Sequence, residues 1–162
     1  MLVCKTVITP LGPMLLAASE AGLAGAWFEG QSHHPDASAW PRVQGQRWLD
    51  SAEEELGAYF QQAHQAFKTP RLSAWGTPFQ QSVWLALSDI PCGSTVSYGQ
   101  LAAHLNKPQA VRALGAAVGR NPWSVFVPCH RVLGAREQLT GYAGGLDRKR
   151  ALLAHEGVAL PA

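Results

Sequence analysis

The sequence has few cysteines, little net charge and no long apolar run. Its 162 residues include three cysteines at wide spacing, and this odd number argues against a disulfide framework. Free thiols are typical of proteins in a reducing compartment. No apolar run approaches the length that spans a bilayer, and polar and charged residues interrupt the N-terminal stretch where a secretory signal needs an apolar core. We therefore expect a cytoplasmic protein that has no membrane partner.

The sequence also lacks the pattern of a metal site. His33 and His34 lie in a polar connector at 29–45, and no cysteine or histidine nearby completes a tetrahedral set of ligands. An exposed loop explains this pair better than metal binding does. We expect no metal and no other cofactor.

The small net charge of +2 conceals a difference between two parts of the chain. Residues 1–75 carry five Lys and Arg against seven Asp and Glu, whereas residues 76–162 carry eight against four. The second part is therefore basic, and a few Lys or Arg contacts to phosphates give an affinity for nucleic acid that does not depend on base sequence. A mixed, solvated surface explains the same charge equally well.

Hydrophobic residues make up 47% of the chain, which is enough to bury a core in one domain or in two small ones. Short apolar runs at 3–9, 14–18 and 23–28 are separated by turns that contain Pro or Gly, and this pattern is typical of an antiparallel three-stranded meander. Apolar residues at 48–60 then recur at helical spacing, so we expect a helix that covers the sheet. Together these elements predict an N-terminal α/β domain at 1–75.

Residues 76–162 predict a second, mostly helical domain. Capping boxes at 77–80 and 97–100 are each followed by apolar residues at helical spacing. A break at 106–108 separates the second of these helices from another helical pattern at 109–120. This order is that of a helix-turn-helix. Periodicity alone favours a helical pair packed for stability over a DNA-binding unit.

The helix expected at 109–120 carries a stripe of small residues that begins with one arginine. Two glycines inside a helix cost roughly 1 kcal/mol each relative to alanine, so a surface that approaches this face closely would compensate for them. A DNA backbone could lie there. The candidate DNA-contact residues are Arg112, Ala113, Gly115, Ala116 and Gly119, with Ser97 from the preceding helix start.

Cys129 and His130 are adjacent and follow Pro128. A thiol reacts as the thiolate, and a histidine that takes its proton favours that form. Pro128 and the apolar residues at 124–127 predict a buried strand that ends where the thiol is presented. An isolated Cys-His dipeptide is more often a buried cysteine beside an incidental histidine.

The position of Glu156 favours a reactive cysteine. The last helix is expected to begin at Asp147 and to end at Gly157, so the carboxylate lies at the negative end of the helix dipole and needs a cation or a donor. His130 is the obvious partner. In the resulting relay Glu156 orients the imidazole, and His130 takes the proton of Cys129 directly or through a water.

Several motifs resemble those of the O6-alkylguanine-DNA alkyltransferase family. They are Pro-Cys-His-Arg-Val at 128–132, Asn-Pro at 121–122, Gly-Tyr-Ala-Gly-Gly at 141–145 and Ser-Tyr-Gly-Gln-Leu-Ala at 97–102. The resemblance runs from about residue 77 to residue 157 and is looser over the first 75 residues. It implies an α/β fold in two parts: an N-terminal antiparallel three-stranded sheet with a covering helix, and a C-terminal winged-helix-like domain with a helix-turn-helix and a hairpin or wing at 133–140.

The resemblance also implies a reaction. The protein would flip O6-alkylguanine, and also O4-alkylthymine, out of duplex DNA and transfer the alkyl group irreversibly to Cys129 in a single turnover. Arg112 would fill the gap in the base stack, Tyr98 would donate a proton to the base, and Asn121 would tie the helix-turn-helix to the active-site turn. The base pocket would be formed by Val132, Tyr142, Ala143 and Gly144.

The expected partner is double-stranded DNA that contains alkylated bases, bound by a monomer, with clustering of several copies on DNA as an open alternative. Three other functions remain. A protein that binds alkylated DNA without repairing it is disfavoured by Cys129, and a thiol hydrolase with a Cys-His-Glu relay needs an oxyanion hole. A helix-turn-helix regulator is disfavoured because the stripe of small residues offers few side chains to read base edges.

Replacing Arg112 with alanine should weaken alkyl transfer from duplex DNA much more than the reaction with a free base analogue. Only the duplex has a gap that the side chain can fill. Single-turnover rates with the two substrates measure the difference. An equal loss with both would contradict the role of Arg112 in the base stack.

Overall fold

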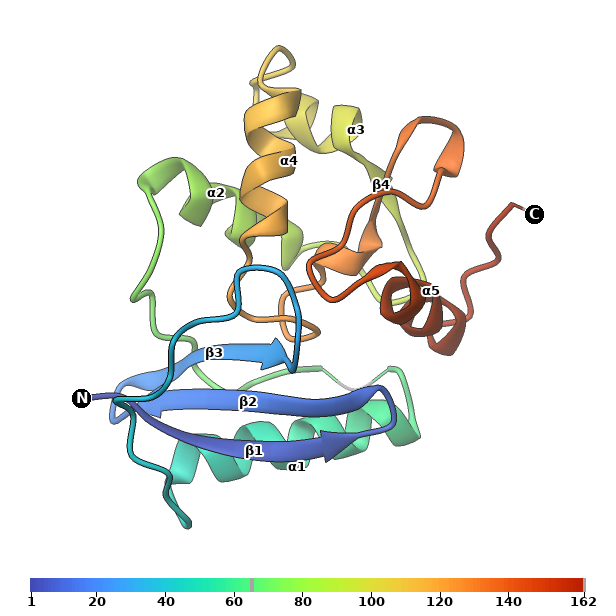
Figure 1. Cartoon of the computed structure of the whole chain (residues 1–162). Coiled ribbons are helices and arrows are strands. Elements are labelled where there is room, and N and C mark those ends of the chain that lie inside the picture. The colour runs from blue at the N-terminus through green and yellow to red at the C-terminus, as the bar shows by residue number, and fades with distance from the viewer. Residues whose placement is uncertain (65, 162) are drawn as a thin grey trace. The chain divides into compact units, whose positions relative to one another are not determined.

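The computed structural model describes residues 1–64 and 66–161, which form two compact units (Figure 1). The first unit comprises residues 1–75 and the short segment 122–126, and the second comprises 76–121 and 127–162. Within the described ranges, none of the helices has the length and apolar character that a membrane span requires.

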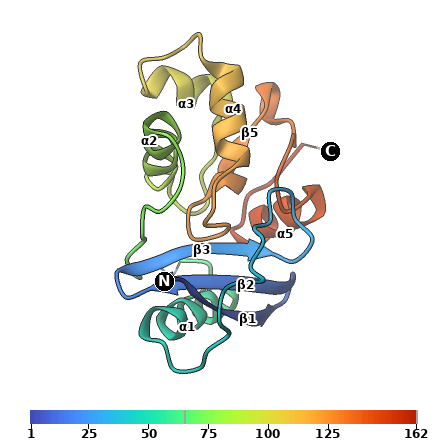
Figure 2. The same ribbon diagram turned by 60° about the vertical axis from the view of Figure 1, so that its left-hand side comes forward.

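The first unit is built on an antiparallel sheet in the order β1 (Val3–Thr9), β2 (Gly12–Ser19), β3 (Gly22–Phe28). β2 contributes to the pairing on both sides, with a bulge between Ala17 and Ala18 where it meets β3. Helix α1 (Arg47–Gln61) lies along one face of the sheet, as Figure 2 shows. The predicted three-stranded sheet with a covering helix is confirmed.

Helix α1 has the apolar face that the spacing of its residues predicts. The helix begins after Gln46, whose side-chain oxygen accepts hydrogen bonds from the first backbone N–H groups. Its buried residues follow one another at intervals of three or four: Leu49, Ala52, Leu56 and Tyr59. This stripe covers the sheet and leaves the charged residues outside.

Segment 122–126 packs along β3. The N–H of Ala26 donates to the carbonyl of Pro122 at 2.8 Å, and the N–H of Ser124 donates to the carbonyl of Ala26 at 2.9 Å. The pairing stops there because Val125 has a φ of 74°, which no strand residue adopts. The buried strand predicted at 124–127 is therefore wrong: these residues are buried, but they form a turn.

The second unit begins with helix α2 (Pro78–Leu87), followed by β4 (Val96–Ser97), α3 (Tyr98–His104) and α4 (Val111–Gly119). Both predicted capping boxes are present, at Thr77 and at Ser97. Helices α3 and α4 pack against each other, and α4 also packs on α2 through its buried face. The helix-turn-helix arrangement predicted from the spacing is thus formed, with α4 shorter than the pattern at 109–120.

The rest of the second unit carries the Cys-His pair. The short helix η1 (Cys129–Arg131) leads into β5 (Val132–Leu133), which pairs in parallel with β4. Residues 133–140 contain the short helical turn η2 (Ala135–Glu137). No two strands within the segment pair with each other, so it is a loop and the predicted hairpin is wrong.

Helix α5 (Leu146–His155) ends at Glu156 and Gly157, as expected. It begins earlier than predicted, after Gly145, whose φ of 93° favours glycine. Asp147, expected as the cap, lies in the first turn instead, where a carboxylate faces the positive end of the helix dipole. The capping role of Asp147 is therefore wrong.

Replacing Gly25 with alanine should destabilise the protein by about 1–3 kcal/mol, the usual cost of overpacking a core. An added Cβ would lie 2.1 Å from the ring of Trp27, which packs against Trp40 and Trp75. The matched control is Gly57→Ala in α1, where an added Cβ would have no atom within 4 Å. There alanine should raise the free energy of unfolding by up to about 1 kcal/mol. Urea unfolding measures both, and equal stabilities of the two variants would contradict the packing at Gly25.

Candidate active site

Cys129 follows a tight backbone turn that proline sets. Pro128 has φ −81° and ψ 63°, the geometry of an inverse γ-turn, and the N–H of Cys129 donates across it to the carbonyl of Val127 at 2.8 Å. The N–H of Arg131 then donates to the carbonyl of Pro128 at 3.0 Å. The thiol thus stands at the start of η1 on a backbone fixed at both ends, and it is 4% exposed.

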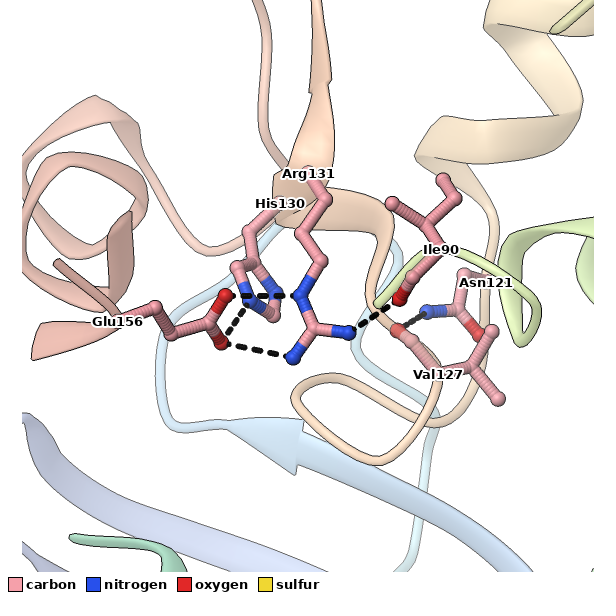
Figure 3. Close-up of polar contacts among 6 residues, drawn as sticks. All are labelled: Ile90, Asn121, Val127, His130, Arg131 and Glu156. Atoms are coloured by element: carbon pink, nitrogen blue, oxygen red, sulfur yellow. Dashed lines mark hydrogen bonds and ion pairs between the residues drawn. The ribbon is translucent and has the colours of Figure 1, made fainter. Parts of the chain in front are cut away.

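Asn121 holds this turn from the end of α4. Its side-chain amide donates to the carbonyl of Val127 at 2.9 Å (Figure 3). The same amide donates to Sγ of Cys129 at 3.2 Å. Asn121 directly follows Arg120, the C-terminal cap of α4. One side chain therefore connects the helix-turn-helix to the thiol.

Glu156 accepts hydrogen bonds from two neighbouring residues of η1. Nε2 of His130 lies 2.7 Å from Oε2 of Glu156, and both side chains are fully buried. The guanidinium of Arg131 donates through Nε to Oε1 at 2.7 Å and through Nη2 to Oε2 at 3.0 Å. Its Nη1 donates to the carbonyl of Ile90 at 2.6 Å (Figure 3). The carboxylate at the helix end thus has the cation that its position requires.

The environment of His130 fixes which ring nitrogen can accept a proton. Burial lowers the pKa of His130, although the hydrogen bond to Glu156 opposes this effect, so the ring is neutral at neutral pH. A neutral ring that donates from Nε2 to a carboxylate has its lone pair on Nδ1. Nδ1 is buried and has no hydrogen-bond partner among residues 1–64 and 66–161. His130 is therefore arranged as a base.

Lys149 of α5 is a fully buried ammonium group. Its Nζ donates to the carbonyl oxygens of Val132 at 2.7 Å, Thr140 at 2.6 Å and Gly141 at 3.2 Å. Burial lowers the pKa of Lys149 to about 8, while the charge of the Cys129 thiolate raises it. Lys149 therefore joins the segment after the cysteine turn to the loop that precedes α5.

The thiol itself is subject to opposing influences. Burial raises the pKa of Cys129, whereas the hydrogen bond from Asn121 and the charge of Lys149 lower it. The thiol form dominates at neutral pH because burial is the largest of these effects. Reaction of Cys129 thus requires a base that removes its proton.

Tyr98 lies at the start of α3 and is half-buried. Burial raises its pKa, a hydrogen bond with the side chain of Thr140 lowers it, and the negative charge of Cys129 raises it further. The phenol therefore keeps its proton at neutral pH. The loop that contains Thr140 continues through half-buried Tyr142 and Ala143 to buried Gly144, all of which the sequence assigned to the base pocket.

An open hollow of about 450 Å³ lies at the start of α4. Its lining includes Arg112 and Gly115 of α4 together with Ser97 and Tyr98 at the start of α3. Ala113, Ala116 and Gly119 do not line it, but the first two are exposed. A Cβ added at Gly119 would meet nothing within 4 Å, so packing inside the protein does not require a glycine there.

Arg131 and Lys149 were not among the site residues predicted from the sequence. Lys149 could have been found, because it shares the helical face of Leu152, Leu153 and Glu156 at i, i+3, i+4 and i+7, and a lysine on a buried face needs acceptors. Arg131 could have been found as the nearest cation to a carboxylate that the helix end disfavours. Among the described residues, no group of three or more His, Cys, Asp or Glu side chains could hold a metal ion.

The comparisons with known proteins agree with this arrangement. Residues 78–158 match the sequence model of the DNA-binding domain of 6-O-methylguanine DNA methyltransferase. A methylated-DNA–protein-cysteine methyltransferase of Mycolicibacterium paratuberculosis is 43% identical over 94% of this chain and 90% of its own length. The chain belongs to this family. The relative of the same name from Methanosarcina acetivorans is 44% identical over 92% of this chain and 94% of its own.

Solved structures of the family have the same fold. The O6-methylguanine methyltransferase of Mycobacterium tuberculosis matches with a TM-score of 0.88 and 41% identity, over 100% of this chain and 96% of its own. The OGT of the same organism in complex with DNA matches with a TM-score of 0.85 and 41% identity, over 94% of this chain and 91% of its own. The family and the fold class predicted from the sequence are confirmed.

Replacing Asn121 with alanine should slow the reaction of Cys129 with iodoacetamide at neutral pH roughly tenfold or more. A hydrogen bond to a charged group is worth about 1.5–3 kcal/mol, and its loss raises the pKa of the thiol. The rate is measured against pH by mapping the modified Cys129 peptide. Because Cys129 ionises in both proteins at high pH, the two rates should converge there, and a constant ratio across the pH range would contradict the effect on ionisation.

Proposed function

We propose that this methyltransferase repairs alkylated DNA by direct reversal, moving the alkyl group from O6-alkylguanine to Cys129 in a single irreversible turnover. The observation that carries the proposal is the buried set formed by Cys129, Asn121, His130 and Glu156, in which Nδ1 of His130 is available as a base. Family membership supports the same reaction. O4-alkylthymine is proposed as a second substrate.

Ionisation of the thiol is the first step of the proposed reaction. The proton of Cys129 passes to Nδ1 of His130, directly or through one water, while Nε2 keeps its hydrogen bond to Glu156. The amide of Asn121 and the ammonium of Lys149 stabilise the thiolate that forms. The base and the donors thus lower the free energy of a charge that burial disfavours.

Transfer of the alkyl group follows. Sγ of Cys129 attacks the alkyl carbon, a C–S bond forms, the bond from carbon to O6 breaks, and its electron pair goes to the base. The phenol of Tyr98, protonated at neutral pH, gives the base a proton. Water does not cleave the thioether at a useful rate, so each molecule acts once. This outcome separates the reaction from that of a thiol hydrolase, which regenerates its cysteine.

The pocket for the flipped base lies between two segments that Lys149 joins. The carbonyls of Cys129 and Val132 are proposed to accept hydrogen bonds from the exocyclic amine of guanine, and Tyr142 with Ala143 and Gly144 to form the wall beside it. Val132 can accept both from Lys149 and from a base, because a carbonyl oxygen has two lone pairs. Lys149 would thus keep both walls at a fixed spacing.

Duplex DNA is proposed to lie against α4. The exposed small residues of this helix let a backbone approach, and Arg112 extends from its first turn to occupy the place of the flipped nucleotide. Ser97 contacts DNA from the adjacent helix start. We assign DNA binding and catalysis to residues 76–162 and an α/β domain to residues 1–75, in a monomer that acts in the cytoplasm, where Cys129 stays reduced.

Incubation with a duplex that carries one O6-methylguanine should add the mass of one methylene to the protein, on Cys129 alone and without turnover. Intact mass and peptide mapping measure the change, and Cys129→Ser is the matched control that should bind the duplex and stay unmodified. Cys92, which is half-buried with a pKa raised by burial, should also stay unmodified. A protein that binds the duplex while no cysteine changes mass is a damage sensor or a regulator, and the roles given to His130, Glu156 and Tyr98 then fail.

A further inference from the structure

The Glu156 carboxylate lies between His130 and Arg131, and the charge of Arg131 alone balances it. Its two oxygens accept from His130 and twice from Arg131, and the whole cluster is buried. A guanidinium keeps its proton at any pH that a protein tolerates, so Arg131 and Glu156 form a pair without net charge. His130 can then remain neutral and still donate from Nε2.

Without Arg131, the same geometry would favour a charged histidine. An unpaired carboxylate 2.7 Å from Nε2 of His130 would hold a second proton on the ring, because an opposite charge at this distance raises the pKa of a histidine. The proton would occupy Nδ1, the one nitrogen able to accept from the thiol. The base would be lost although every atom of His130 stayed in place.

We propose that Arg131 is a positioning residue that keeps His130 neutral by compensating the charge of Glu156, so that Nδ1 remains free to take the proton of Cys129. The proposal rests on the alkyl-transfer function proposed above. It assigns to Arg131 a contribution to chemistry beyond fold stability, which acts through Glu156 and His130.

The third contact of Arg131 supports this role. Nη1 donates to the carbonyl of Ile90, just beyond the end of α2, so the guanidinium is held from both sides (Figure 3). Its planar fork meets Glu156 through two hydrogen bonds. The other charged group that acts on His130 is Lys149, whose ammonium also lowers the pKa of His130. Arg131 and Lys149 therefore act in the same direction.

The test is an NMR titration of histidine-labelled protein without DNA, with the His130 signal assigned by the variant His130→Gln. In the unmodified protein His130 should be neutral at neutral pH and carry its proton on Nε2. In Arg131→Met the midpoint should rise by roughly one pH unit or more. In Arg131→Met combined with Glu156→Gln it should return to a low value, because the anion has gone. Arg150→Met, an exposed arginine of α5, should leave the midpoint unchanged.

Alkyl transfer gives a second readout. The rate with Arg131→Met should fall severalfold or more at neutral pH and recover as the pH rises through the new midpoint of His130, and Arg131→Lys should restore most of the rate at neutral pH. A merely structural arginine would lower the rate at every pH and leave the midpoint where it was, which would overturn the proposal.

The proposal remains testable if Arg131→Met does not fold. A His130 that is protonated at neutral pH in the unmodified protein would overturn it without any variant. The titration is also independent of DNA, so a protein that never alkylates Cys129 would refute the proposed function while leaving the charge relation between Arg131 and His130 intact.

Discussion

The buried carboxylate of Glu156 is the interaction on which the rest of the second unit depends. It stands at the end of α5, where the helix dipole disfavours a negative charge, and it accepts hydrogen bonds from the side chains of His130 and Arg131 in η1. Removing Arg131 would leave the carboxylate buried without a compensating charge, which is far more costly than a lost surface ion pair. The end of α5 and the cysteine turn are consequently fixed to each other by charge as well as by packing.

The cysteine turn is held in the same way on its other sides. Asn121 reaches it from the end of α4, and Lys149 reaches the carbonyl of Val132 from α5. These bonds run from long polar side chains to backbone carbonyls, so they fix the course of the main chain more than they add apolar burial. These hydrogen bonds hold the turn on several sides, which suits the proposed nucleophile because it must meet its electrophile in line.

Local signals predicted the parts of the fold that are determined locally. The three strands, the capping boxes at Thr77 and Ser97 and the pairing of His130 with Glu156 follow from spacing, cap chemistry and charge. The strand expected at 124–127 does not form, because its apolar residues are buried by packing on β3 while Val125 adopts a left-handed backbone. In this segment, burial of apolar residues therefore does not indicate a strand.

Arg131 and Lys149 were not predicted for the same reason. Arg131 and Lys149 look like surface charges when only their type is considered, and both act as donors inside the protein. Their partners are mostly backbone carbonyls and one distant carboxylate, which no local pattern displays. The residues proposed to carry the chemistry have recognisable motifs, whereas those that set the charge around them do not.

The burial of Cys129 affects how long each protein molecule remains active. A protein that is consumed in one event loses its capacity permanently if an oxidant or a stray electrophile reaches the sulfur first. A thiol that is 4% exposed and mostly protonated meets both conditions for low background reactivity, since oxidants and electrophiles attack the accessible thiolate. If Cys129 is the acceptor as proposed, burial, which makes the thiol harder to ionise, also protects the sulfur until the protein meets damaged DNA.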